Sequence, residues 1–291
     1  MKKIFILWTL IGACALSTAV AQPLNVATYN VRNNNNTGDA LQGNGWQNRL
    51  PVISKLIQFH DFDLFGSQEV MNGQLNDLLA ALPDYGFIGV GRDDGRQGGE
   101  YSPIFYKKAR LELLKSGNFW LNEHPETPGL GWDAACTRIC SWGEFKDKAS
   151  GKIFYLFNTH FDHVGVVARA ESCRLILKKM KQIAGSSTVV LMGDFNTPQS
   201  DEVYRILTRE GHLDDAFCTA QIHYAQNGTF NNFDPMGKDD ARIDHILVDP
   251  AIKVVRYGIL TDHYWSTNAD GQAQLRTPSD HYPVATQLLL K

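Results

Sequence analysis

Residues 188–196 read Thr-Val-Val-Leu-Met-Gly-Asp-Phe-Asn, a short apolar run with polar side chains at its end. Apolar and β-branched residues bounded by turn residues are typical of a buried strand. Asp194 and Asn196 follow the run directly, and alternate residues of a short loop can point the same way. The segment therefore predicts a core strand that brings an acid and an amide to one place.

Similar runs on both sides of this segment predict further strands. Two apolar stripes with helical spacing, Leu75 to Leu82 and Cys173 to Ile183, predict helices that lie on a sheet. Another helix is expected to start at Ser200 as its N-cap. No interdomain linker is visible, so residues 22–291 are expected to form one domain. The predicted strands are Leu24–Tyr29, Leu64–Gln68, Pro103–Tyr106, Ile139–Phe145, Ile153–Thr159, Thr188–Met192, Ile243–Val248, Ile252–Leu260 and Val284–Leu290.

Polar clusters stand at the ends of five apolar runs and just before the last one. A single Asp at a strand end is usually a turn or a helix cap, and a lone His is more often a core residue. Each cluster alone is therefore weak evidence of catalysis. The clusters are Tyr29-Asn30-Val31-Arg32, Gln68-Glu69-Val70, Asn158 to His163, Gly193 to Asn196, Arg242 to His245 and Ser279-Asp280-His281.

The order and identity of the clusters resemble the endonuclease/exonuclease/phosphatase superfamily, and the resemblance extends over residues 24–290. It implies a four-layered α/β sandwich of two packed mixed β-sheets flanked by helices, and metal-dependent hydrolysis of a phosphoester bond. Segments 91–95 and 131–138 also resemble an exported bacterial subgroup whose substrates are largely unassigned. The matching positions are Asn30, Glu69, His160, Asp194, Asn196, Asp244, Asp280 and His281.

The resemblance implies a metal site and a base. Glu69 is the first expected ligand of a Mg²⁺ or Mn²⁺ ion, helped by Asn30 and Asp280, because hard cations prefer oxygen ligands. Asp194 is the expected base for the attacking water. Asn196 would hydrogen-bond that water or a phosphate oxygen.

Two histidines are expected to donate to phosphate oxygens as charge builds in the transition state. A neighbouring carboxylate raises the pKa of a histidine, because it favours the charged form. Asp244 is expected to serve His281 in this way, and Glu100 to serve His160, so both histidines should act as cations. For Glu100, a solvated loop acid is the alternative.

One arginine and one further acid complete the expected site, and a second arginine departs from the family pattern. Arg32 stands where one branch of the superfamily carries an acid, so a second metal ion is in doubt. Arg138 and Asp162 are predicted to bind substrate, although an ion pair with a local acid is the alternative for Arg138. The sequence has no His-x-x-x-His or Cys-x-x-Cys spacing, which argues against a dedicated zinc site.

The N-terminus has the layout of a signal peptide. Two lysines precede the apolar run 4–11, and Ala19-Val20-Ala21 stands before Gln22. A membrane anchor is disfavoured because the apolar run is short. We therefore expect removal of residues 1–21 and a periplasmic or secreted protein that does not span a membrane. Lipidation at Cys14 is the alternative.

The composition is that of an ordinary folded domain, with 43% hydrophobic and 20% charged residues in a chain of 291. The formal net charge is −3, and loss of Lys2 and Lys3 with the signal peptide brings it to −5. No basic field is therefore available to attract a long polyanion.

Three functions remain open at this point. The favoured one is hydrolysis of a small or lipid-derived phosphoester, because the long loops 91–99 and 122–133 could wall off a compact pocket. A secreted nuclease is the second, and the net charge argues against it. A catalytically inactive ligand-binding module is the third, and it would predict loss of the catalytic residues. A monomer without an obligate protein partner is expected.

Four cysteines follow the signal peptide, and this even count permits disulfides without requiring them. An extended chain from Cys136 to Cys140 would place these residues roughly 13 Å apart, too far for a bridge. They would pair only across a bend. Buried free thiols are therefore the favoured interpretation for all four, which include Cys173 and Cys218.

Overall fold

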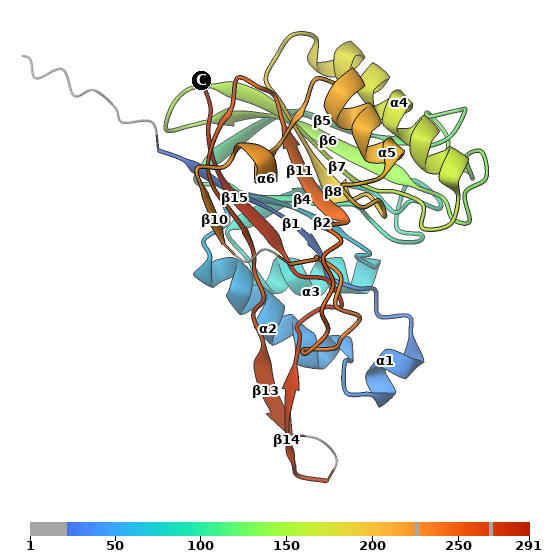
Figure 1. Ribbon diagram of the computed structural model, residues 1–291, viewed down its shortest axis with the longest axis vertical. Coiled ribbons are helices and arrows are strands. Elements are labelled where there is room, and N and C mark those ends of the chain that lie inside the picture. Colours follow the sequence, from blue (N-terminus) through green and yellow to red (C-terminus); the bar gives the residue numbers. More distant parts are fainter. Residues whose placement is uncertain (1–21, 225–226, 268–269) are drawn as a thin grey trace, which may run out of the picture.

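The computed structural model describes residues 22–224, 227–267 and 270–291. The predicted signal peptide, with Cys14, lies outside these residues and stays a prediction. Two large mixed sheets pack against each other, and helices cover the outer face of each (Figure 1). The predicted α/β sandwich of two mixed sheets flanked by helices is therefore confirmed. No helix in the described parts is long and apolar enough to cross a membrane.

The first sheet has seven strands in the order β10-β12-β15-β1-β2-β4-β3. At its centre β1 (Leu24–Asn30) runs parallel to β2 (Leu64–Gln68), with Asn30 opposite Gln68. Their carboxyl ends therefore lie at the same edge of the sheet. The other strands are β3 (Tyr85–Ile88), β4 (Ile104–Lys107), β10 (Ile222–Tyr224), β12 (Lys253–Ile259) and β15 (Val284–Leu289).

The second sheet has six strands in the order β5-β6-β7-β8-β11-β9. Strand β7 (Ile153–His160) runs parallel to β8 (Val189–Asp194), so that His160 lies opposite Asp194. On the other side of β8, the antiparallel strand β11 (Asp244–Val248) places Asp244 opposite Asp194. Three predicted site residues thus form one row. The other strands are β5 (Leu111–Trp120), β6 (Ile139–Asp147) and β9 (Asp214–Asp215).

Helices form the two outer layers. On one side lie α2 (Trp46–Phe59) and α3 (Asn72–Ala81), and on the other lies α4 (Val166–Ala184) (Figure 1). The two predicted stripes belong to α3 and α4, and Cys173 and Ile176 of α4 are fully buried. The shorter helices are α1 (Thr37–Leu41), α5 (Glu202–Arg205), the π-helix Ile206–Glu210 and α6 (Ala216–Thr219).

The helix expected to start with Ser200 as its cap starts later. Asp201 is the N-cap of α5, and its side chain accepts a hydrogen bond from the amide of Val203 at 2.8 Å. A carboxylate at this place satisfies a free amide of the first turn and faces the positive end of the helix dipole. The expectation was wrong because the residue after Ser200 supplies a charged acceptor.

A buried polar network joins the two sheets beneath their common edge. Gly66 of β2 permits close approach, since a Cβ there would lie 2.4 Å from Asn158 Oδ1 of β7. Asn158 is fully buried; its Oδ1 accepts from Gln68 Nε2 at 2.7 Å and its Nδ2 donates to Ser67 O at 2.9 Å. Because buried polar groups that lose a partner are costly, this network fixes how β2 and β7 meet.

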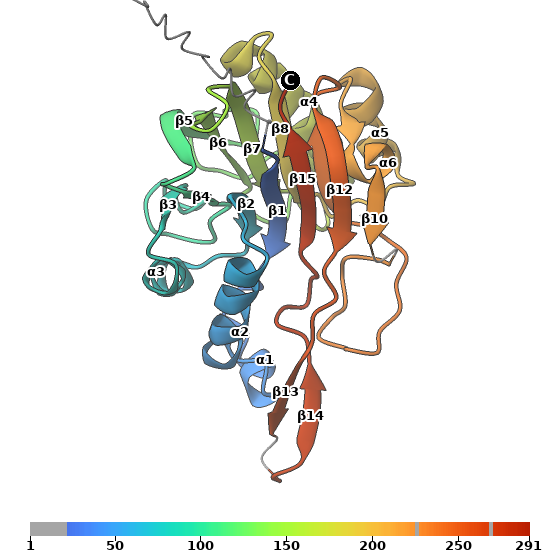
Figure 2. The ribbon, with the colours of Figure 1, turned by 90° about the vertical axis from the view of Figure 1, so that its left-hand side faces the viewer.

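A separate hairpin of β13 (Tyr264–Thr267) and β14 (Ala273–Arg276) projects from the sandwich (Figure 2). The buried Arg276 anchors it, since Nη1 donates to Gln42 O and to Asn44 Oδ1, each at 2.7 Å. The hairpin strands were not predicted from the sequence. Their side chains are mostly exposed or half-buried, so they form no apolar run.

The four cysteines after the predicted signal peptide are free thiols. Cys140 and Cys173 are buried, as predicted, and Cys136 is half-buried. Cys218 is exposed, so the expectation of a buried thiol was wrong there. It lies in the short helix α6, which leaves this side chain uncovered.

Candidate active site

A cavity of about 480 Å³ opens where β1, β2, β7 and β8 end. Eleven residues were predicted for the site, and eight of them line this cavity. Asn30 and Asp244 are fully buried behind its wall, and Asp162 lies beside it without lining it. The eight lining residues are Glu69, Glu100, Arg138, His160, Asp194, Asn196, Asp280 and His281.

Asn30 joins the acids of the two sheets. Its Nδ2 lies 3.0 Å from Glu69 Oε1 and 3.0 Å from Asp194 Oδ2. Its Oδ1 accepts from the amide of Arg32 at 3.0 Å. The Asn30 side chain therefore holds two carboxylates in place with its amide nitrogen, while its oxygen is engaged with the backbone.

Three of the turns around the cavity have left-handed backbone conformations. Arg32, Glu69 and Asn196 have φ values of 56°, 60° and 46°. Asn tolerates this region, but for Arg and Glu it costs on the order of 1–3 kcal/mol. Side chains compensate, since Asn30 Oδ1 binds the Arg32 amide and Asp194 Oδ1 binds the Asn196 amide at 2.9 Å. Such strain clusters at functional sites.

Glu69 and Asp280 form the acidic end of the cavity. Arg32 Nη1 lies between them, 3.9 Å from Glu69 Oε2 and 3.5 Å from Asp280 Oδ2. Burial raises the pKa of Asp280, and the Glu69 charge adds to this effect although the charge of His281 opposes it. Two buried carboxylates at one place favour a cation, and oxygen donors of this kind suit Mg²⁺ or Mn²⁺.

His281 is paired with Asp244 on its buried side. Its Nδ1 lies 2.8 Å from Asp244 Oδ2, and its Nε2 lies 3.7 Å from Asp194 Oδ2. Burial lowers the pKa of His281, but the charges of Asp244 and Asp194 outweigh burial and raise it well above the usual range. This arrangement favours a cationic His281 with one N–H on Asp244 and the other at the cavity.

Asp194 lies at the centre of the site. Burial, and then the charge of Asp244, raise the pKa of Asp194 to about 7. Its Oδ2 is 3.5 Å from His160 Nε2 and close to His281. A carboxyl group that titrates near neutral pH is suited to proton transfer as a general base.

His160 is held by Asn196, whose Nδ2 lies 3.0 Å from His160 Nε2 and 3.0 Å from Phe161 O. An amide nitrogen only donates, so this network assigns the imidazole proton to Nδ1. Burial, together with the charges of Arg138 and Arg92, lowers the pKa of His160 well below its usual value. The arrangement favours a neutral His160, whereas the sequence led us to expect a cation.

Glu100 lies near His160 but is not hydrogen-bonded to it. Its Oε2 is 4.0 Å from His160 Nδ1, an atom without a hydrogen-bond partner among the described residues. The Glu100 carboxylate instead forms an ion pair with Arg92 and accepts from Asn33 Nδ2 at 3.2 Å. Glu100 therefore lines the cavity and orients Arg92, which differs from the role expected for it.

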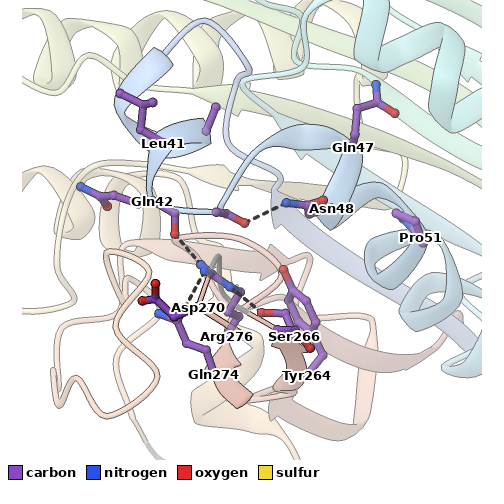
Figure 3. Close-up of a pocket in the computed structure, with 13 residues that line it drawn as sticks. Leu41, Gln42, Gln47, Asn48, Pro51, Tyr264, Ser266, Asp270, Gln274 and Arg276 are labelled. Carbon is purple, nitrogen blue, oxygen red and sulfur yellow. Dashed lines mark hydrogen bonds between the residues drawn. The ribbon is translucent and has the colours of Figure 1, made fainter. Parts of the chain in front are cut away.

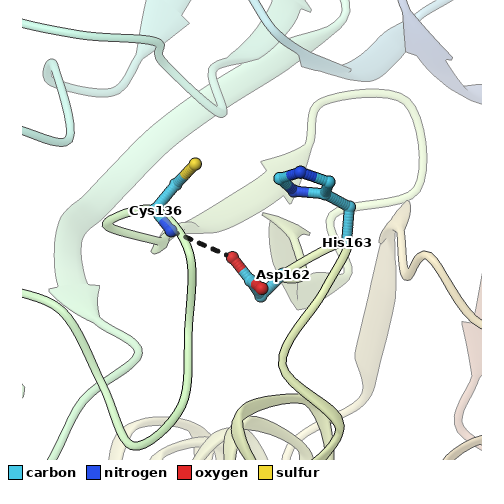
Figure 4. Close-up of side chains that lie close together, drawn as sticks. All are labelled: Cys136, Asp162 and His163. Atoms are coloured by element: carbon cyan, nitrogen blue, oxygen red, sulfur yellow. Dashed lines mark hydrogen bonds between the residues drawn. The ribbon is translucent and has the colours of Figure 1, made fainter.

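Cys136, Asp162 and His163 bring potential metal ligands together beside the cavity (Figure 4). Asp162, however, accepts from the amides of Cys136, Val164 and Gly165 at 3.2, 3.0 and 2.7 Å. Arg138 also enters the cluster, with Nη2 3.0 Å from His163 Nδ1 and Nε 3.4 Å from Asp162 Oδ2. Both oxygens of Asp162 are thus already occupied by protein donors, which leaves this carboxylate little capacity to bind a metal cation.

The sequence did not assign a role to every residue of the cavity. Arg92, Asn33, His163 and Phe230 also line it, and the Phe230 ring packs edge-on against the His281 ring with 5.1 Å between the ring centroids. None of these four is a matched motif position, although His163 ends the polar cluster that starts at Asn158. For Arg92 a signal existed, since it lies within the segment 91–95 that resembles the exported bacterial subgroup.

A larger cavity, about 720 Å³, lies between the β13–β14 hairpin and residues 40–51 (Figure 3). Its lining is rich in amides and hydroxyls, including Gln42, Asn48 and Ser266. It lacks the coupled acids and imidazoles of the smaller cavity among its described lining residues. We therefore regard the smaller cavity as the candidate active site.

Comparison with known sequences points to one family. A sequence model described as the Endonuclease/Exonuclease/phosphatase family matches residues 27–281. An uncharacterised protein of Acanthamoeba polyphaga mimivirus is 27% identical over 257 residues, which cover 82% of this chain and 90% of that protein. Nocturnin of Drosophila melanogaster is 24% identical over 170 residues, covering 55% of this chain and 25% of nocturnin.

Solved structures agree in fold. A family protein of Bacteroides thetaiotaomicron has a TM-score of 0.90 at 47% identity, covering 93% of this chain and 99% of that one. A mannosyl-6-phosphatase of the same organism has a TM-score of 0.88 at 48% identity, covering 92% of this chain and 100% of the other. The human nocturnin catalytic domain, at 18% identity, shares the fold with a TM-score of 0.67 over 92% and 93% of the chains.

Proposed function

This chain belongs to the endonuclease/exonuclease/phosphatase family and is a phosphoester hydrolase, and from that premise we propose that it acts outside the cytoplasm, with a divalent cation, on small phosphomonoesters. One observation carries the proposal. Residues as distant in sequence as Asn30, Asp194 and His281 converge on a cavity of about 480 Å³.

A divalent cation fits the acidic end of the cavity. Glu69 and Asp280 are the proposed ligands, because both are buried carboxylates and the charge of Glu69 raises the pKa of Asp280. Asn30 is proposed to support the site by holding Glu69. A bound Mg²⁺ or Mn²⁺ would supply Lewis-acid stabilisation of negative charge on the phosphoryl group.

The side chains of the cavity can perform the proton transfers of hydrolysis. We propose that Asp194 removes a proton from the attacking water, while Asn196, fixed by His160, positions that water or a phosphate oxygen. His281, as a cation held by Asp244, donates a hydrogen bond from Nε2 to a phosphate oxygen on which charge accumulates. The P–O bond to the leaving oxygen breaks as water adds, and the leaving oxygen takes up a proton from solvent.

The cavity and the charge of the chain favour a small substrate over nucleic acid. Its size is in the range of small-molecule sites. Three arginines, Arg32, Arg92 and Arg138, line it, whereas the chain as a whole is acidic, with a net charge of −3. The relative described as a mannosyl-6-phosphatase supports a sugar phosphate as the first substrate to test.

Hydrolysis by residues 22–291, expressed alone and freed of metal, tests the proposal. Mannose 6-phosphate, p-nitrophenyl phosphate, bis(p-nitrophenyl) phosphate and an oligonucleotide would be compared with Mg²⁺, with Mn²⁺ and with EDTA. We expect the two monoesters to release phosphate when Mg²⁺ or Mn²⁺ is present. EDTA should abolish this release. Faster cleavage of the oligonucleotide would support the nuclease alternative, and no cleavage of any compound would support an inactive binding module.

Export is tested separately in the native host. Cell fractionation and N-terminal sequencing are expected to find the protein outside the cytoplasm with Gln22 at its start. A lipid on Cys14, seen by mass spectrometry and lost in Cys14→Ala, would instead support the lipoprotein alternative.

A further inference from the structure

Arg138 has an unused hydrogen-bonding group next to the proposed active site. The residue is 4% exposed and lines the cavity. Its Nη1 is buried and has no hydrogen-bond partner within the described parts of the chain. A buried guanidinium N–H without a partner costs free energy, so such a group suggests that a ligand completes it.

The other nitrogens of Arg138 are fixed by protein groups. Nε lies 3.4 Å from Asp162 Oδ2, and Nη2 lies 3.0 Å from His163 Nδ1. Asp162 is itself held by three backbone amides. The guanidinium is therefore oriented in advance, and a ligand that binds Nη1 does not have to order the side chain.

Arg92 adds a second unpaired donor to the lining of the cavity. It is held by its ion pair with Glu100, and its Nε has no hydrogen-bond partner among the residues that the structure describes. The nearest carboxylate oxygen of Asp93 is 3.9 Å from that nitrogen. Two arginines in the lining of one cavity offer N–H groups that match anionic oxygens.

We infer that Arg138 and Arg92 form a subsite for the extra ionised oxygen of a phosphomonoester, and that this subsite makes the enzyme prefer monoesters to diesters. The inference rests on the function proposed above. A phosphomonoester carries about −1.5 to −2 charges near neutral pH, because its second pKa is about 6. A diester carries one charge and has an ester group in place of the additional ionised oxygen. Its binding therefore gains little from Arg138 and Arg92.

Arg138→Gln tests the inference with two substrates that carry no other anionic group. We expect kcat/KM for p-nitrophenyl phosphate to fall about 10–100-fold, the usual loss for a charge-assisted hydrogen bond. The value for bis(p-nitrophenyl) phosphate should change less than about threefold. Arg92→Gln should act in the same direction, and Arg138→Lys should recover part of the loss because it keeps the charge.

Arg169→Gln is the matched control. Arg169 also contacts Asp162, with Nη1 3.0 Å from Asp162 O, but it does not line the cavity. Its ratio of monoester to diester activity should equal that of the wild type. Equal losses on both substrates in Arg138→Gln and Arg92→Gln, or no loss on either, would overturn the inference. Thermal melting shows whether Arg138→Gln has lost its fold. If it has, the two substrates are compared in Arg92→Gln instead.

Binding separates this inference from the proposed function. Calorimetry with inorganic phosphate and with dimethyl phosphate measures the same preference without catalysis. Arg138→Gln should weaken phosphate binding about 10–100-fold and leave dimethyl phosphate almost unchanged. If the wild type hydrolyses neither test compound, the proposed function is wrong while this binding difference still supports the subsite. Equal weakening for both ligands, or none, overturns the subsite.

Discussion

His281 Nδ1 lies 2.8 Å from Asp244 Oδ2, and both side chains are buried beside the cavity. The carboxylate therefore stabilises the imidazolium and leaves Nε2 as the donor that faces the proposed substrate. A donor of this kind stabilises a transition state only while it is protonated. Asp244 therefore sets the pH above which His281 loses its proton and the reaction slows.

Asp244→Asn should lower kcat about 100-fold or more and move the alkaline limb of the pH profile to lower pH. Burial alone lowers the pKa of His281, and the Asp244 charge is the first of the effects that raise it. Without that charge the imidazole loses its proton at a lower pH. The dependence of kcat/KM on pH measures the shift.

Asp215→Asn is the control for loss of a buried acid. Asp215 lies on the same sheet and pairs with Arg242 at 2.9 Å, outside the cavity lining. It should reduce thermal stability while the alkaline limb stays in place. An alkaline limb that does not move in Asp244→Asn would mean that His281 is not the acid whose proton the reaction requires.

Asp194→Asn should lower kcat at least about 100-fold with the fold retained, because an amide cannot accept the proton of the attacking water. A base works in its deprotonated form, so wild-type activity should fall as the pH drops below about 7, where burial and Asp244 place the pKa of Asp194. Steady-state rates from pH 5 to 9 and thermal melting check both statements. Near-normal turnover in Asp194→Asn would remove this residue from the role of base.

Glu69→Gln should raise the Mg²⁺ concentration needed for half-maximal activity, by about tenfold or more, because a neutral oxygen binds a hard cation less well than a carboxylate. Glu144→Gln is the control, since Glu144 is a buried acid 3.1 Å from Lys115 and does not line the cavity. Metal titrations of activity, and calorimetry with Mn²⁺, would measure the change. An unaltered titration in Glu69→Gln would place the metal elsewhere.

The sequence predicted the core strands well because they are buried on both faces. Strands β1, β7 and β8 lie within one or two residues of the expected ranges, since burial on both sides leaves short runs that are mostly apolar. Strand β5 was missed because most of its middle residues are exposed or half-buried. Helix α2 was missed too, and it contains Pro51, which reads as a helix breaker in sequence.

The cavity was predictable where residues stand at strand ends, and not where loops supply them. Asp194 and Asp244 are neighbours across β8 and β11, so strand pairing brings them together. Arg92 comes from a loop whose path depends on tertiary contacts, such as the bond from Trp120 Nε1 to Arg92 O at 2.7 Å. No periodicity in the sequence encodes such a contact. The charge state of His160 was likewise hidden, because it depends on burial and on two arginines.

Asp162→Asn should reduce stability rather than remove a substrate contact, although the sequence predicted a substrate-binding role. Burial raises the pKa of Asp162, but hydrogen bonds from backbone amides, first that of Gly165, and the charge of Arg138 outweigh burial and lower it to about 2. An acid with a depressed pKa stabilises the fold above its unfolded pKa, and this contribution disappears as the pH falls through the folded value.

The difference in unfolding free energy between wild type and Asp162→Asn should therefore be about 1–2 kcal/mol above pH 4 and should vanish as the pH falls towards 2. Urea unfolding at a series of pH values measures it. Since Asp162 also orients Arg138, the variant should lose part of the monoester preference at neutral pH, whereas the surface variant Glu171→Gln should change neither property. A stability difference that persists at pH 2 would show that the carboxylate charge is not what holds this loop.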